Sequence, residues 1–304
     1  MNRDKKRSGS RTRKRRSKFS VLDYEKIQKR IEDEELPMSE IEKIIDVTTN
    51  SIYETKTITS GPIREVEVYP MFLKKDIPEE FRAKETKEAR KNLNSKNAEK
   101  YFIRKANMNF GMNDYYITLG YLTKNAPKDH MQAKKDIRKY INKLNYLYKK
   151  KQMKSGIAEK KCKYIKYMYV TEISQEGKGR YHHHIIMNSV LPMEVVEEAW
   201  KLGRRNNIRK IYPDDLHITG LAKYLAKDPK GKKRWGCSKG LKEPVITRNI
   251  SKFSRKKINN MALNHNLIEE EMEKANPGYK FIDATINQNE YNGKWYIYTR
   301  MRKI

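Results

Sequence analysis

Histidine is scarce in this chain, yet three histidines stand next to one another. The sequence has six histidines in 304 residues, and the segment YHHHIIMN (181–188) contains His182, His183 and His184. The segment is rich in strand-forming residues, and side chains along a strand alternate between its faces. His182 and His184 therefore share one face, about 7 Å apart, and His183 takes the other. Two imidazoles on one face can bind one metal ion, although the same pattern also fits an exposed polar strand.

A carboxylate precedes the histidines. Glu172 ends another predicted strand, YIKYMYVTEI (164–173), and the segment SQEGKG (174–179) predicts the turn of a β-hairpin. The turn brings Glu172 near the start of the histidine strand, but only the strand register decides whether they share a face. Two imidazoles and a carboxylate suit Mn²⁺, Mg²⁺ or another divalent metal with open coordination positions. A closed zinc site is not expected, because the sequence has no CxxC.

A second group of reactive residues lies in GLAKYLAKD (220–228), which predicts a helix. Tyr224 and Lys227 are three residues apart and so face the same side. A tyrosine can become a covalent nucleophile when a base, a cation or a metal activates it. A nearby ammonium group stabilises a phenolate or a phosphate. The alternative is an ordinary amphipathic helix with its tyrosine in the core, since the chain has 20 tyrosines.

The elements around these residues predict an α+β domain with an antiparallel sheet and flanking helices. Hydrophobic patterns, prolines and capping residues predict the order β–α–β–β–α–β–α, in which Asp214 or Asp215 caps the last helix. The predicted segments are strands at 115–121, 164–173, 181–188 and 208–211 and helices at 129–151, 192–202 and 214–227.

The regions on either side are expected to be mainly helical. Residues 1–18 contain ten lysines or arginines and predict a disordered basic tail. The predicted divisions are an accessory region (19–111), the domain with the candidate site (112–245) and a C-terminal extension (246–304). Predicted flanking helices cover 24–35, 39–47, 75–100, 251–263 and 267–275, with strands only at 64–69 and 294–300.

Charge narrows the class of protein. Lysine and arginine total 68 against 38 acidic residues, which makes the net charge +30 and indicates a polyanionic partner such as nucleic acid. No apolar run is long enough for a membrane span, no secretory signal is visible, and two cysteines cannot form a disulfide framework. We therefore expect no membrane partner and a reducing compartment.

Together these motifs resemble a known family. YHHHIIMN is similar to the HUH motif, LAKYLAK (221–227) to the Y-x-x-K motif that follows it, and ITLGY (117–121) to the upstream strand. The segment from Trp235 to Leu241 also resembles the filamentous-phage-like branch of rolling-circle replication initiators. Two features depart from the pattern: Tyr224 is the single tyrosine of its helix, and His183 stands where the family usually has an apolar residue.

The resemblance implies an HUH endonuclease with an RRM-like catalytic domain. Such an enzyme nicks single-stranded DNA at an origin through a 5′-phosphotyrosine intermediate on Tyr224, with Lys227 at the phosphate. It further implies that His182, His184 and Glu172 bind Mn²⁺ or Mg²⁺, and that Trp235 can stack on bases. Host helicase and polymerase would act with it in the cytoplasm of a bacterial cell that carries a plasmid, phage or mobile element. The alternatives are a relaxase, a single-tyrosine transposase, or a non-catalytic single-stranded nucleic-acid-binding protein.

Overall fold

The computed structural model describes residues 19–20, 22–49, 52–82, 87–173, 180–203, 207–226, 235–289 and 293–304. Three subjects of the sequence predictions lie outside these residues: the basic tail (1–18), the hairpin turn (174–179) and Lys227. Among the helices that the structure describes, none combines the length and apolar character that crossing a bilayer requires.

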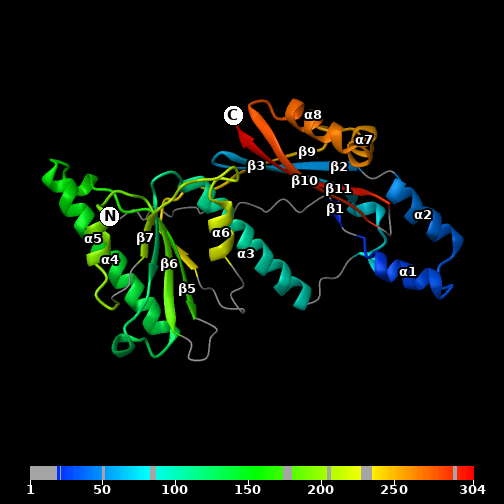
Figure 1. Cartoon of the computed structure of the whole chain (residues 1–304). Helices are drawn as coiled ribbons and strands as arrows, with labels where there is room; N and C mark the ends of the chain where they lie inside the picture. Colours follow the sequence, from blue (N-terminus) through cyan, green and yellow to red (C-terminus); the bar gives the residue numbers. More distant parts are fainter. Residues whose placement is uncertain are drawn as a thin grey trace, which may run out of the picture.

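Two antiparallel sheets with packed helices form the described chain, which confirms the predicted α+β class (Figure 1). The first sheet has the order β10–β11–β3–β2–β9, with β1 paired to β3. Its strands are β1 (Phe19–Ser20), β2 (Ile52–Ser60), β3 (Ile63–Leu73), β9 (Val245–Asn249), β10 (Tyr279–Gln288) and β11 (Trp295–Lys303).

The first sheet unites strands from the two ends of the sequence. β3 pairs with β11, and β2 pairs with β9, so the predicted accessory region and C-terminal extension share one sheet. The flanking regions therefore hold this sheet in addition to their helices. Those helices are α1 (Tyr24–Glu32), α2 (Met38–Thr49), α7 (Arg255–Leu263) and α8 (His265–Ala275).

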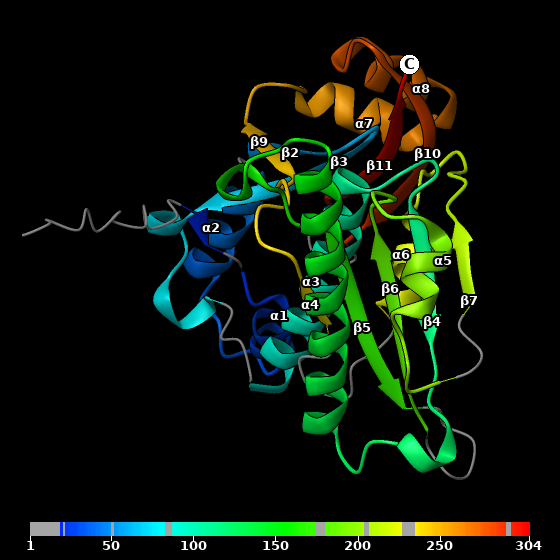
Figure 2. The ribbon, with the colours of Figure 1, turned by 90° about the vertical axis from the view of Figure 1, so that its left-hand side faces the viewer.

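The second sheet carries the candidate site and has the order β7–β4–β6–β5–β8. Its strands are β4 (Tyr115–Leu119), β5 (Tyr167–Ile173), β6 (Tyr181–Met187), β7 (Asn207–Lys210) and β8 (Trp235–Cys237). Helix α4 (His130–Lys154) runs along one face of this sheet, together with α5 (Met193–Glu198) (Figure 2). Alternate residues of the strands, such as Ile117 and Ile185, pack there against Ile137 and Leu144 of α4 in a common core cluster. The opposite face is left for other helices.

Helix α3 (Lys87–Asn109) connects the two sheets (Figure 1). Its buried residues Phe102, Ala106 and Phe110 pack in a cluster against the second sheet. Arg104, on another side of the helix, forms an ion pair with Glu65 of β3 in the first sheet. One helix therefore sets the position of each sheet relative to the other.

Helix α6 (Thr219–Leu225), which contains the predicted nucleophile, is anchored to α3. The side-chain amide of Asn107 donates a 2.7 Å hydrogen bond to the hydroxyl of Thr219. His217 donates from Nε2 to the carbonyl of Phe110 at 2.8 Å. These two bonds fix the start of α6 against the end of α3.

The start of α6 differs from the prediction. The N-cap residue is Ile218, so neither Asp214 nor Asp215 caps the helix. The Asp214 carboxylate instead accepts a 2.8 Å hydrogen bond from the backbone N–H of Leu216. Aspartate readily makes such local turns, and here the turn uses the side chain before the helix begins.

Candidate metal centre and nucleophile

Strand register brings the predicted metal ligands together. In the antiparallel pair β5–β6, Glu172 lies directly opposite His182, and Val170 lies opposite His184. Residues at alternate positions share a face, so Glu172, His182 and His184 all lie on the face that α4 does not cover. The register, which periodicity could not supply, thus resolves the question of the shared face.

The ligand atoms of the three residues converge. The Glu172 Oε2 atom lies 3.4 Å from His182 Nε2 and 3.8 Å from His184 Nε2. One ligand atom from each residue can be chosen so that all three lie within 4.8 Å of one another. His184 is buried, while the other two are half-buried, which leaves the cluster open on one side. Within the described chain, this is the group whose donor atoms could hold a metal ion.

The two imidazoles differ in their protonation. A hydrogen bond to Glu172 raises the pKa of His182, against the effect of burial. Burial, reinforced by the neighbouring His182, lowers the pKa of His184 to about 4. At pH 7 His184 is therefore neutral, which is the state in which an imidazole binds a metal.

The second nitrogen of each imidazole is also engaged, and this orients both rings. His182 Nδ1 lies 3.4 Å from the carbonyl oxygen of Arg180. His184 Nδ1 lies 2.9 Å from the hydroxyl of Tyr116 and 3.2 Å from that of Thr118. When Nδ1 carries the proton in both rings, each Nε2 presents its lone pair to the Glu172 side. Metal-binding histidines usually have such partners at the other nitrogen, so the donor set fits a divalent cation.

Sequence reasoning missed Tyr116 and Thr118. Both belong to β4, where Thr118 is the register partner of His184. The Tyr116 ring stacks on the His184 ring at an interplanar angle of 12°, and burial raises the pKa of its hydroxyl. Their position two residues apart in a strand was the available signal, but only the β4–β6 register connects them to the site.

His183 lies on the opposite face, as strand alternation predicted. It is fully buried, and its ring nitrogens lie 2.7 Å from the Tyr121 hydroxyl and 2.9 Å from the Thr171 hydroxyl. Its ring also contacts Trp200 edge to face. Burial lowers the pKa of His183 to about 3, so it is a neutral, hydrogen-bonded part of the core beneath α4.

Tyr224 lies above the same face as the converging ligands. Its ring centroid is 6.1 Å from that of His184, and its side chain is 52% exposed. Ala222 and Leu225 of the same helix are buried against the sheet, which turns Tyr224 toward the surface. The phenol is thus accessible to a large substrate.

Of the other predicted residues, Trp235 is half-buried at the start of β8. Its ring packs at 5.6 Å from Phe102 and 5.9 Å from Tyr101, measured between centroids. It lines a cavity of about 640 Å³ with Tyr167 and Tyr169. Aromatic residues therefore do surround Trp235, and its role in base stacking stays a prediction.

The fold and the site define an α+β protein whose antiparallel sheet carries a two-histidine, one-carboxylate cluster beside an exposed tyrosine. Residues 114–229 match the family model of the replication-associated protein ORF2. The match spans the elements from β4 to α6 and fits a rolling-circle replication initiator, in agreement with the resemblance seen in the sequence. No curated protein and no solved structure matches the chain significantly.

Proposed function

We propose that this chain nicks and rejoins single-stranded DNA and thereby initiates rolling-circle replication of a plasmid, phage or mobile element. One observation carries the proposal: Tyr224 stands over the face on which Glu172, His182 and His184 converge. The segment that matches the replication-associated family contains all four residues. The enzyme would be of the HUH type and would act in the cytoplasm of the cell that carries the element.

The reaction is a transesterification. The Tyr224 phenol oxygen attacks the scissile phosphorus, the new O–P bond forms, and the bond from phosphorus to the 3′ oxygen breaks. The phenol loses its proton and the departing 3′ oxygen gains one. The 5′ phosphate remains on the tyrosine as an ester, so a second hydroxyl can rejoin the strand without ATP. The free 3′ end primes a host polymerase.

The three converging side chains would hold the divalent cation, Mn²⁺ or Mg²⁺. A divalent cation at a phosphodiester polarises it and stabilises the charge that develops during transfer. The chain itself supplies the rest: Tyr116 and Thr118 orient His184, and α6 presents Tyr224. Lys227, which follows α6 in the sequence, is proposed to neutralise the phosphate. Unwinding is assigned to a host helicase, because the sequence has no GxxxxGK[ST] loop.

Covalent capture tests the proposal. Tiled single-stranded oligonucleotides from the replicon that encodes the chain are incubated with the protein and Mn²⁺, and denaturing gels reveal any protein–DNA conjugate. We expect a conjugate with the wild type and with Tyr212→Phe, a control at a tyrosine that is 72% exposed outside α6. Tyr224→Phe should bind DNA and form none.

The outcomes separate the alternatives. A conjugate that persists in Tyr224→Phe would show that another residue is the nucleophile. DNA binding by the wild type with no conjugate on any oligonucleotide would favour the non-catalytic binding protein. Conjugates that form on transfer-origin or transposon-end DNA instead of a replication origin would favour the relaxase or transposase.

A further inference from the structure

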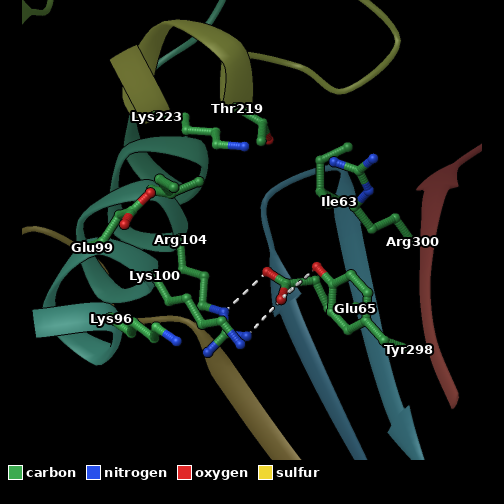
Figure 3. A pocket seen from close by; sticks show the side chains of 11 residues that line it. Ile63, Glu65, Lys96, Glu99, Lys100, Arg104, Thr219, Lys223, Tyr298 and Arg300 are labelled. Carbon is green, nitrogen blue, oxygen red and sulfur yellow. Dashed lines mark hydrogen bonds and ion pairs between the residues drawn. The ribbon is translucent and has the colours of Figure 1, made fainter. Parts of the chain in front are cut away.

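A cationic cleft lies between the two sheets, beside the helix that carries Tyr224. It has a volume of about 360 Å³ and is lined by α3, α6, β3 and β11 (Figure 3). Lys96, Lys100 and Arg104 stand four residues apart along one side of α3, and Lys223 reaches the cleft from α6. The first sheet contributes Arg300.

Some of these charges are already neutralised by the protein. Arg104 forms a bidentate pair with Glu65, with Nη2 at 2.5 Å from Oε2 and Nε at 2.9 Å from Oε1. The Tyr298 hydroxyl donates to the same carboxylate at 3.1 Å. Arg300 pairs with Asp283 of β10. These groups build the floor of the cleft and need no ligand.

The lysines are different. Lys96, Lys100 and Lys223 are exposed, and within the described chain no hydrogen bond or ion pair engages their ammonium groups. Glu99 also lines the cleft, so the unpaired groups are three cations and one anion. Like charges four residues apart destabilise a helix by a few tenths of a kcal/mol, which an anion in the cleft would relieve.

The position of Lys223 connects this cleft to the site. Lys223 and Tyr224 are consecutive in α6, and successive helical residues point in directions about 100° apart. Tyr224 therefore faces His184 while Lys223 faces the cleft. A chain of phosphates that passes over α6 would meet both.

We infer that the cleft formed by α3, α6 and the first sheet binds the sugar–phosphate backbone of single-stranded DNA that flanks the bond cleaved by Tyr224. This inference rests on the proposed function. The lysines offer flexible point charges, and the one aromatic residue of the cleft, Tyr298, already has its hydroxyl engaged by Glu65. The cleft consequently reads phosphates and not bases, and its contribution is independent of sequence.

A matched pair of triple variants tests this inference. Lys96→Gln/Lys100→Gln/Lys223→Gln removes the three unpaired cations of the cleft. Lys135→Gln/Lys139→Gln/Lys143→Gln is the control, because these exposed lysines have the same four-residue spacing on α4 and their loss changes the net charge equally. Fluorescence anisotropy measures the binding of a labelled oligo(dT) to each full-length protein over a range of KCl concentrations.

Counterion release sets the expected size of the effect. For single strands, each phosphate contact adds about 0.7 to the slope of log K against log salt. Three lost contacts should reduce the slope by about 2 and weaken binding by about 10- to 100-fold at 0.1 M salt. The control should change affinity by less than about 3-fold. Lys96→Gln/Lys100→Gln, which leaves α6 intact, should lose about two thirds of the slope change.

Three results would overturn the inference: no loss in the cleft variant, an equal loss in both triple variants, or a loss for duplex DNA alone. The readout also separates this inference from the proposed function. Absence of a covalent conjugate in the wild type would refute nicking while leaving the measured cleft binding in place. A conjugate that forms normally in a cleft variant with unchanged affinity would refute only the cleft.

Discussion

The two hydroxyls beside His184 allow a sharp test of the metal centre. Tyr116 and Thr118 offer alternative partners to one nitrogen, His184 Nδ1, at 2.9 and 3.2 Å. Tyr116→Phe keeps the ring that stacks on His184, and Thr118→Val keeps the shape of the side chain. Each single variant leaves the other hydroxyl in place, so we expect Mn²⁺ affinity to change by less than about 3-fold.

The double variant leaves the Nδ1–H group without a side-chain partner. The His184 side chain is only 7% exposed, so water replaces the lost hydroxyls poorly. An unpaired buried donor costs about 1–3 kcal/mol, which corresponds to about 10- to 100-fold weaker metal binding. The expected result is thus a strongly non-additive double-mutant cycle.

Isothermal titration with Mn²⁺ at pH 7.5 measures the affinity of each variant. Tyr121→Phe is the matched control, because its hydroxyl contacts His183 on the opposite face of the same sheet at 2.7 Å. We expect wild-type affinity in this control. Wild-type affinity in the double variant, or an equal loss in the control, would refute the argument that these hydroxyls orient a metal ligand.

Two further predictions concern stability. A Cβ atom at Gly203 would lie 2.2 Å from the backbone oxygen of Gly120, so Gly203→Ala should lower the free energy of unfolding by about 1–3 kcal/mol in urea titrations; Gly120→Ala, whose Cβ meets nothing within 4 Å, should not, and equal losses would contradict this. Burial lowers the pKa of His217, so the unfolded chain binds the extra proton and the stability from this group is lost as pH falls below about 6.5. His217→Asn, which suits the positive φ of 61°, should flatten that acid loss in melting curves between pH 7.5 and 5.5, and an unchanged pH dependence would exclude His217 as its source.

The second sheet was largely predictable because its residues carry local signals. The β-branched and aromatic runs around Ile117 and Ile185 marked buried strands, and the apolar stripe of α4 marked its packing face. Alternation correctly separated His183 from its two neighbours. Neighbouring helices and a hairpin then sufficed for the fold class.

The first sheet was not predictable in the same way. β2, IYETKTITS, mixes charged and hydroxyl residues with few apolar ones, and Glu54 and Thr57 are buried there through tertiary contacts. Its partner β9 lies far along the sequence and consists of exposed residues. Periodicity reports burial against neighbours, not which distant strands pair. The same limit hid Tyr116 and Thr118, whose relation to His184 depends on register.

The closure of the first sheet has a consequence for how the molecule comes into being. Pairing of β3 with β11 encloses the entire second sheet in one chain loop, and the entropic cost of closing a loop rises with the length of its flexible part. Once β4 to β8 have folded, that loop is short in effect. During synthesis from the N-terminus, the segment with the histidines emerges before β10 and β11. The final residues of the polypeptide therefore act as the clasp that completes assembly.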